Sequence, residues 1–139
     1  MNNCIFCKIV RGEIPCYKVY EDENTLAFLD IHPLNPGHTL VIPKKHFHWV
    51  WDIDNIEEHY RVVKKIALAI KKVQKTDYVI SLVFGQEVRH AHTWLVPRFK
   101  NDGHGSAIDI KNVKKIDAKE MSNIANKIYK LLLSKARQM

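Results

Sequence analysis

The sequence lacks any apolar run close to the roughly 20 residues that a membrane-spanning helix requires. Cysteine is scarce: the chain has three, an odd number, and two of them share a CxxC motif. This pattern excludes a secreted disulfide framework and, in a reducing compartment, is typical of metal binding or redox chemistry. The first residues also lack the charged-then-apolar pattern of a signal peptide, so we expect a cytoplasmic protein.

Repeats, low-complexity tracts and long linkers are also missing. Of the 139 residues, 46% are hydrophobic and 27% are charged, which is the balance of a folded globular protein. A chain of this length buries enough apolar surface to fold without disulfides. We therefore expect a single domain over residues 1–139.

The charge balance is basic, because 22 Lys and Arg outnumber 15 Asp and Glu and leave a formal charge of +7. Such a charge favours anionic partners, either nucleotides or nucleic acid, without indicating which. It is equally typical of a lysine-rich surface that only faces solvent.

Periodicity predicts strands grouped with separate helices, which favours an α+β fold over a doubly wound sheet. One helix is predicted to begin at Asp54 with Glu57, and another at Asp117 with Glu120, both capping-box patterns. The region before residue 43 is predicted to hold only short strands and turns. The expected strands are 25–30, 39–42, a buried strand at 78–83, and 88–96, with an irregular loop at 99–113.

The positions of the histidines in the sequence are more informative than their number. Along the strand predicted at 88–96, alternation puts His90, His92 and Trp94 on one face, roughly 6.6 Å apart in successive pairs. A neutral imidazole can attack phosphorus or ligate a metal near pH 7. An HxH pattern alone is weak, because exposed strands with two histidines are common.

The CxxC of Cys4 and Cys7 would complete a tetrahedral zinc site together with two histidines. Two buried free thiols are the alternative. His38 and His46 stand at the two ends of the strand predicted at 39–42, where they are available to a neighbouring strand.

Four sequence blocks occur in the order and spacing of the histidine triad (HIT) family, and together they cover about residues 4–98. The chain most resembles the Hint-type branch of nucleotide-binding hydrolases. Its C-terminal part, residues 99–139, matches only in having a helix. The blocks are CIFCKIVRGEIP, VYEDENTLAFLDI, GHTLVIPKKH and GQEVRHAHTWLVPR.

The resemblance implies a five-stranded antiparallel sheet with two helices, paired as a homodimer with a continuous sheet. It also implies nucleotidyl transfer to His92, which would attack the α-phosphorus of a nucleoside phosphoramidate or a related nucleotide conjugate. Water would then release the nucleoside monophosphate. His90 would be the first triad member and His38 the supporting histidine on the neighbouring strand.

For binding, the resemblance implies a purine nucleotide such as AMP or GMP. Asp30 would accept the ribose hydroxyls, and Gln86 would contact phosphate. The remaining nucleotide contacts would be Ile5, Phe6, Ile9 and Ile31 around the base, with Trp94 at the third triad position. In metal-bearing relatives the ligands fall on Cys4, Cys7, His46 and His90, a closed set that implies structural zinc.

Three departures from the family pattern lie at the phosphate end. Trp94 stands where the third histidine is expected, and its indole offers one N–H donor but no titratable acid. The loop before Gly85 is short, and Glu87 follows Gln86 where a serine is usual. A hydrolase, a nucleotide-binding module without catalysis, and a small basic zinc protein that binds nucleic acid therefore remain open.

Cys16 has no partner in the pattern and is expected to be a buried thiol. Four histidines receive no role and are expected to be surface or satisfied core residues: His32, His48, His59 and His104.

Overall fold

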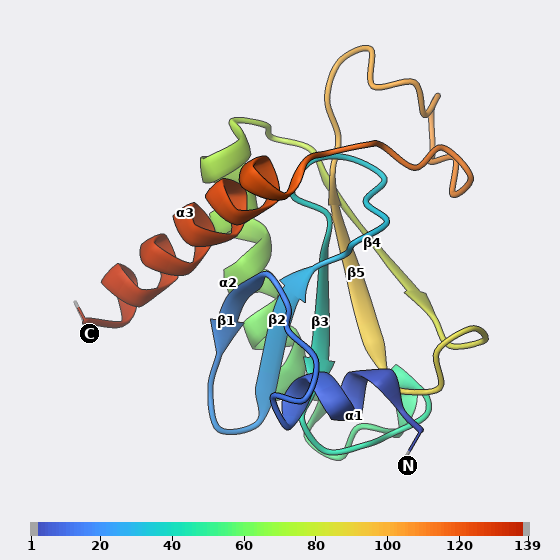
Figure 1. Cartoon of the computed structure of the whole chain (residues 1–139), viewed down its shortest axis with the longest axis vertical. Helices are drawn as coiled ribbons and strands as arrows, with labels where there is room; N and C mark the ends of the chain where they lie inside the picture. The colour runs from blue at the N-terminus through green and yellow to red at the C-terminus, as the bar shows by residue number, and fades with distance from the viewer. Residues whose placement is uncertain (1–2, 138–139) are drawn as a thin grey trace.

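A computed structural model describes residues 3–137 of the chain. Five strands form one antiparallel sheet in the order β1-β2-β3-β5-β4 (Figure 1). Among these residues, no helix combines the length and apolarity needed to cross a membrane. The strands are β1 (Lys18–Glu21), β2 (Thr25–Leu29), β3 (Thr39–Pro43), β4 (Val79–Phe84) and β5 (His92–Pro97).

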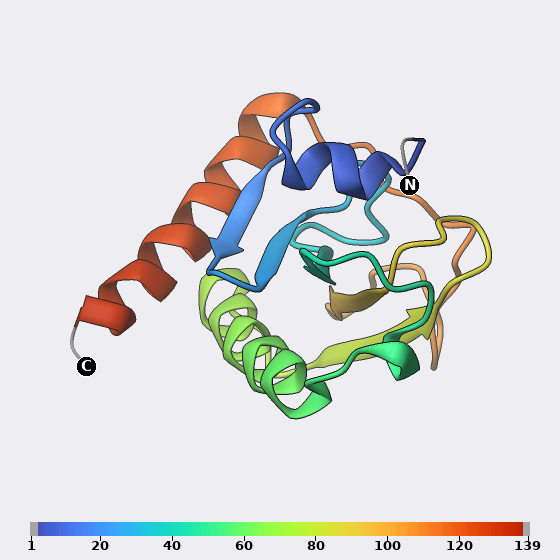
Figure 2. The same cartoon turned by 90° about the horizontal axis from the view of Figure 1, so that it is seen from below.

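Helices cover both faces of the sheet. The two long helices, α2 (Ile56–Gln74) and α3 (Ala118–Arg137), lie together on one face, and the short α1 (Ile5–Val10) lies against the other (Figures 1 and 2). Every residue of β2 and β3 is buried as a result. Alternation sends Ala27 and Leu29 into the core under α2 and α3, and Leu26 and Phe28 into the core under α1. We call this second side of the sheet the α1 face.

The predicted α+β fold with an antiparallel sheet is confirmed. The prediction of only strands and turns before residue 43 is wrong, because α1 occupies Ile5–Val10. This helix has six residues, too few for a periodic signal to emerge from the sequence. Its first turn is fixed by Cys4, whose Sγ accepts the Cys7 backbone N–H at 3.3 Å. A 3₁₀ helix, η1 (Val50–Asp52), precedes α2.

Of the two predicted helix starts, one is confirmed and the other is shifted by one residue. The start of α3 is confirmed, since Asp117 Oδ1 accepts the Glu120 backbone N–H at 2.8 Å. The start of α2 is one residue later than predicted, because Asn55 takes the capping position in place of Asp54. Asn55 Oδ1 accepts the Glu58 backbone N–H at 3.3 Å, while Asp54 forms an ion pair with Lys45.

The last two strands also differ from the prediction. The strand predicted to be buried at 78–83 is the edge strand β4, whose residues are half-buried or exposed. Its apolar composition is typical of a central strand, but among the described residues only β5 pairs with it. The strand predicted at 88–96 begins only at His92, so alternation does not place His90. Both imidazoles still contact Phe6, at ring-centroid distances of 5.9 Å and 5.2 Å.

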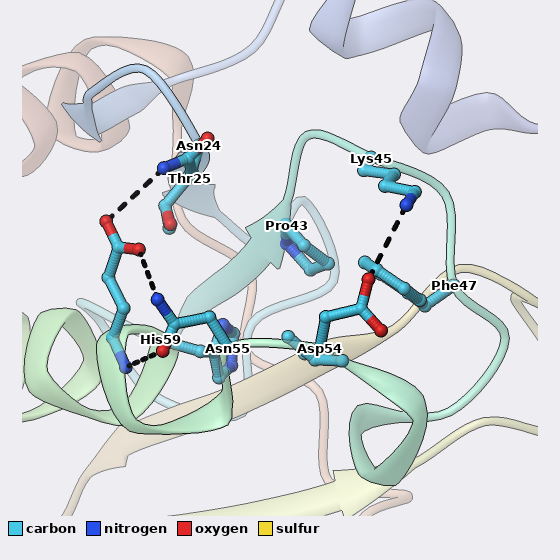
Figure 3. A pocket seen from close by; sticks show the side chains of 10 residues that line it. Asn24, Thr25, Pro43, Lys45, Phe47, Asp54, Asn55 and His59 are labelled. Atoms are coloured by element: carbon cyan, nitrogen blue, oxygen red, sulfur yellow. Dashed lines mark hydrogen bonds and ion pairs between the residues drawn. The ribbon is translucent and has the colours of Figure 1, made fainter.

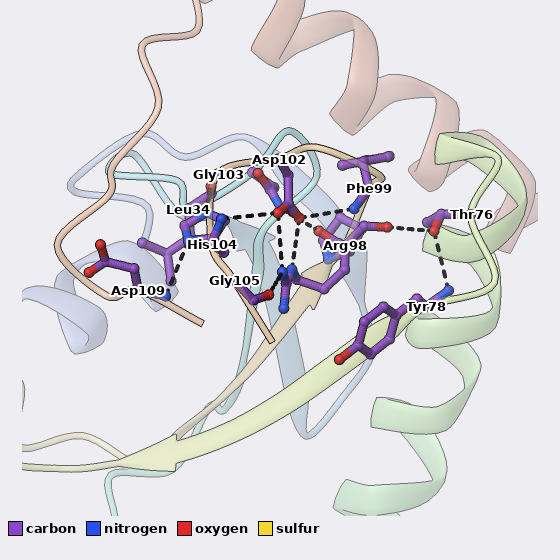
Figure 4. A network of polar contacts seen from close by, with 12 residues as sticks. Leu34, Thr76, Tyr78, Arg98, Phe99, Asp102, Gly103, His104, Gly105 and Asp109 are labelled. Atoms are coloured by element: carbon purple, nitrogen blue, oxygen red, sulfur yellow. Dashed lines mark hydrogen bonds and ion pairs between the residues drawn. The ribbon is translucent and has the colours of Figure 1, made fainter. Parts of the chain in front are cut away.

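The irregular loop at 99–113 is confirmed, and a buried ion pair holds it (Figure 4). Arg98, 5% exposed, donates to Asp102 through Nε at 2.7 Å and Nη2 at 3.1 Å. Asp102 also accepts the Asn35 side-chain amide at 2.9 Å. His104 donates from Nε2 to the Leu34 carbonyl at 2.6 Å. The network therefore ties this loop to residues 34–35, just before His38.

Arg98→Met is expected to destabilise the protein by about 3–5 kcal/mol, because it leaves the buried Asp102 carboxylate without its cation. The same arginine, with backbone N–H donors, holds the pKa of Asp102 well below its usual range. Urea unfolding monitored by circular dichroism measures the change. Arg11→Met, which removes an exposed partner of Glu13, is the matched control and should unfold like the wild type. Equal midpoints for the two variants would contradict this role.

Candidate functional site

Four chemically reactive or polar side chains gather on the α1 face. Asp30 follows Phe28 by two residues, His38 precedes Leu40 by two, and both Phe28 and Leu40 pack under α1. His92 and Trp94 alternate with Thr93 and Leu95, of which Leu95 enters the opposite core. Pairing of Leu40 with Trp94 in the β3–β5 ladder brings the segments together. Residues far apart in the chain thus share one surface of the sheet.

One ring nitrogen of His92, Nδ1, is held by a hydrogen bond, and the other, Nε2, has no hydrogen-bond partner among the described residues. Its Nδ1 lies 2.7 Å from the His90 carbonyl oxygen, which can only accept, so Nδ1 carries the proton. Nε2 therefore holds a lone pair. The side chain is 6% exposed, and burial lowers its pKa, which keeps the imidazole neutral near pH 7. Such an imidazole is suited to act as a nucleophile, a base or a ligand.

His38 lies beside Asp30 in a fixed tautomer. Its Nδ1 accepts the Leu34 backbone N–H at 3.0 Å, so Nε2 carries the proton. Nε2 lies 3.6 Å from Asp30 Oδ2, too far for a good hydrogen bond. Burial lowers the pKa of His38 to about 3, so the imidazole is neutral and no ion pair forms. Burial raises the pKa of Asp30, whose Oδ1 accepts the His32 backbone N–H at 2.8 Å.

Trp94 fills the surface next to these groups. Its ring centroid lies 4.9 Å from that of His38 and 5.1 Å from that of Phe84. The indole Nε1–H is buried and has no acceptor among residues 3–137. Buried donors without a partner are unusual, and Nε2–H of the adjacent His38 is another among these residues.

The residues expected to contact the base differ in their exposure to solvent. Phe6 is buried on α1 and touches the His92 ring, whereas Ile5 of the same helix is 46% exposed. Ile31 follows Asp30 and is 68% exposed. Ile9 is half-buried on α1, and Gln86 is exposed on the loop after β4. Exposed apolar side chains around a polar face suit contact with a flat ligand.

The four predicted metal ligands converge. One ligand atom from each of Cys4, Cys7, His46 and His90 lies within 4.8 Å of all the others. Cys7 Sγ is 3.3 Å from His46 Nδ1, and Cys4 Sγ is 3.4 Å from His90 Nδ1. His90 donates from Nε2 to the Pro43 carbonyl at 2.7 Å, which turns Nδ1 toward the cluster. Two sulfurs and two imidazoles form a donor set that fits zinc.

Without a metal, burial and the neighbouring Cys4 raise the pKa of Cys7 to about 11. A metal must therefore displace a proton from this thiol, and its affinity should rise with pH. Cys16, the third cysteine, is half-buried rather than buried, and burial also raises its pKa.

Two features near the site were not predicted from the sequence. His59 of α2, 3% exposed, places Nε2 at 2.9 Å from Thr93 Oγ1, directly behind His92. A Cβ on Gly85 would lie 2.4 Å from the Trp49 ring, so this glycine allows the loop that carries Gln86 to pack closely. The sequence analysis left His59 without a role, because nothing local indicated which strand residue it contacts. The remaining histidines without assigned roles include His104, which is a satisfied core residue as expected.

A cavity of about 230 Å³ lies away from the α1 face, at the start of α2 (Figure 3). Several of its polar residues pair with one another: Glu58 accepts from Asn24 at 3.4 Å and from Asn55 at 3.1 Å, and Lys45 lies 3.5 Å from Asp54. His59 also lines it, and its Nδ1 is buried without a partner among the described residues. None of the expected nucleotide contacts lines it. The cavity therefore has no part in the candidate site.

A family model described as the HIT domain matches residues 11–101. The chain belongs to the HIT family. An adenosine 5′-monophosphoramidase of Schizosaccharomyces pombe is 37% identical over 76% of this chain and 81% of its own length. An adenylylsulfatase of Arabidopsis thaliana is 39% identical over 73% of this chain and 55% of its own length.

A crystal structure of a zinc-bound histidine triad family protein from Mycobacterium smegmatis has a TM-score of 0.80. It is 29% identical to this chain, and the match covers 99% of each. The expected HIT fold is therefore confirmed. The cluster of four ligands could hold a metal in this chain, as its donor set and geometry allow.

Zinc titration of the metal-free protein should show one tight site and a rise in thermal midpoint, because the metal binds the folded state. Cys7→Ser should weaken the affinity by at least about 100-fold, since it removes a ligand directly. Cys16→Ser is the matched control, and its zinc affinity should equal that of the wild type. Zinc binding that survives Cys7→Ser but not Cys16→Ser would contradict the assignment.

Proposed function

We propose that this HIT protein hydrolyses nucleoside phosphoramidates or related nucleotide conjugates through a nucleotidyl intermediate on His92. The observation that carries the proposal is the fixed tautomer of His92, with Nδ1–H on the His90 carbonyl and a lone pair at Nε2. The names of two relatives, a monophosphoramidase and an adenylylsulfatase, support the class of reaction.

In the first step His92 Nε2 attacks the α-phosphorus, and the bond to the leaving group breaks with its electron pair on the leaving atom. An amine leaving group also takes up one proton from solvent. The hydrogen bond from Nδ1–H to the His90 carbonyl stabilises the imidazolium that forms. In the second step water attacks phosphorus, the P–N bond to His92 breaks, and one proton passes to solvent. Nucleoside monophosphate leaves, and His92 is neutral again. Gln86 and nearby backbone N–H groups are proposed to stabilise the phosphoryl charge.

The nucleotide is proposed to be a purine nucleotide such as AMP or GMP, lying along the α1 face. Asp30 would accept hydrogen bonds from the ribose hydroxyls through the oxygen that faces His38. His38 would support this end of the site as a neutral donor. Around the base would lie Ile5, Phe6, Ile9 and Ile31, and Trp94 would occupy the third triad position.

Zinc is proposed as a structural metal on Cys4, Cys7, His46 and His90. When bound, it would crosslink the segments that carry these four residues and would supply no group to the reaction. Within this set His90 contributes to catalysis by position, because its carbonyl orients His92 while its ring faces the metal site.

AMP release from adenosine conjugates with P–N and P–O linkages tests the proposal. His92→Ala should lower the rate by at least about 10³-fold, because the nucleophile is gone. AMP binding measured by calorimetry should be retained in this variant, since the base and ribose contacts remain. Cys16→Ser should retain full activity.

Equal rates for His92→Ala and the wild type would overturn the nucleophile assignment. AMP binding without any turnover would favour the non-catalytic nucleotide-binding module, which the indole of Trp94 makes a real second candidate. Binding of RNA or DNA that mononucleotide does not displace would instead favour a small basic zinc protein that binds nucleic acid, an alternative supported by the charge of +7 and the CxxC motif.

A homodimer is proposed through the β4 edge. The backbone of Val79–Phe84 pairs with β5 on one side only among residues 3–137, and Tyr78 and Phe84 are 50% and 42% exposed beside it. A long apolar edge of this kind favours pairing with another strand. Antiparallel pairing of two copies would extend the sheet across both protomers.

Ser81→Lys should shift the protein from dimer to monomer, because the substituted residue lies midway along β4 and would face its own copy with like charge. Sedimentation velocity at several concentrations measures the change. Ser106→Lys, on the exposed loop at 99–113, is the matched control and should remain dimeric. A monomeric wild-type protein at high concentration would contradict the proposed dimer.

A further inference from the structure

The group beside His92 on the α1 face is an indole that cannot donate a proton as an acid. Trp94 lies two residues after His92 on the same side of β5, between the cross-strand partners Leu40 and Leu82. Its Nε1–H is a neutral donor, buried and without an acceptor among the described residues. The position therefore offers a hydrogen bond to a ligand atom but no proton.

The two histidines nearest to it hold their ring protons in fixed positions, although Nε2–H of His38 has no hydrogen-bond partner among the described residues. His38 keeps its only proton on Nε2, facing Asp30, because Nδ1 accepts the Leu34 N–H. His90 uses Nε2–H on the Pro43 carbonyl and turns Nδ1 toward the two cysteines. Oδ1 of Asp30 accepts the His32 N–H, and Oδ2 lies 3.6 Å from Nε2 of His38, on the side proposed above for the ribose. Glu87 and Arg89 are exposed on the loop before His90.

This arrangement matters because leaving groups differ in their need for a proton. An amine that leaves a P–N bond must be protonated, since the deprotonated amine is far too basic to depart. Sulfate, phosphate and carboxylate depart from a P–O bond as stable anions. A neutral N–H donor is sufficient to stabilise the charge that develops on such an oxygen.

Resting on the proposed function, we propose that Trp94 makes this site selective for acid anhydrides of nucleoside monophosphates over nucleoside phosphoramidates. Trp94 is a specificity-determining residue in this reaction: its indole N–H binds the bridging oxygen or another oxygen of the leaving group.

The step balances without an acid. The Nε2 lone pair of His92 forms the P–N bond, the P–O bond to the leaving group breaks, and the leaving oxyanion takes the electron pair. No proton moves in this step, because His92 keeps Nδ1–H and the anion departs unprotonated. Hydrolysis of the intermediate then proceeds as described above, with water as the co-reactant and one proton released.

Two substrates that share the AMP moiety separate the alternatives: adenosine 5′-phosphosulfate, with a P–O–S linkage, and adenosine 5′-phosphoramidate, with a P–N linkage. The wild-type protein should show a kcat/KM for the phosphosulfate at least about 100-fold higher, the lower range of what a general acid contributes. Trp94→His restores an acid at this position. It should lower that ratio by at least about tenfold, mainly by raising kcat on the phosphoramidate.

Two further variants separate proton donation from packing. Trp51→His makes the same change at an indole that is 73% exposed on η1, and it should leave the ratio unchanged. Trp94→Phe keeps an apolar ring without the N–H. It should slow the phosphosulfate reaction without improving the phosphoramidate reaction. In Trp94→His, the phosphoramidate rate should fall as pH rises, because the new imidazolium loses its proton.

A wild-type ratio near one would overturn the selectivity, and this measurement needs no variant to fold. An unchanged ratio in Trp94→His, with His92-dependent turnover retained, would overturn the role of Trp94. Absence of His92-dependent AMP release from both substrates would overturn the proposed function itself, so the two failures are distinguishable.

Discussion

The hydrogen-bonded ladder between β3 and β5 is the constraint on which the candidate site depends. It pairs Leu40 with Trp94 and so sets His38, just before β3, beside the strand that begins at His92. A slip of one residue would turn His92 and Trp94 into the core under α2 and α3 and bring Thr93 and Leu95 to the α1 face. The burial of Leu95 opposes such a slip, because its side chain lies in that core. Apolar packing on one face thus maintains the chemistry on the other.

The cysteine and histidine cluster supports the same arrangement from the other end of the site. α1 begins with Cys4 and Cys7, while His46 follows β3 and His90 precedes β5. A metal on these four ligands would join the helix that covers the site to the two strands that carry it. The contact of Phe6 with His92 would then be fixed by the same crosslink. A structural metal at this cluster would affect the proposed reaction only by positioning α1 and the two strands.

Much of the fold and of the site could be predicted from the sequence. The strand predicted at 25–30 is a short, mostly apolar run, the one at 39–42 is followed by Pro43, and the helix at Asp117 carries its own capping pair, so local physics decides them. The four candidate metal ligands and His92 followed from the resemblance to a family, and the structure brings the four candidate ligands together. The failures have a common cause. α1 is too short to show a period, and the edge position of β4 depends on which strand pairs with it.

The sequence by itself determined the family, the antiparallel α+β fold and the presence of an indole at residue 94, because residue identity alone decides what can titrate or ligate. Only the tertiary structure decided the tautomers of His38 and His92, since each depends on a backbone group that folding places beside the ring. It also decided that the Trp94 N–H lies buried without an acceptor. Hydrogen bonds and burial are properties of neighbours, and the neighbours in this site come from strands and loops far apart in the chain.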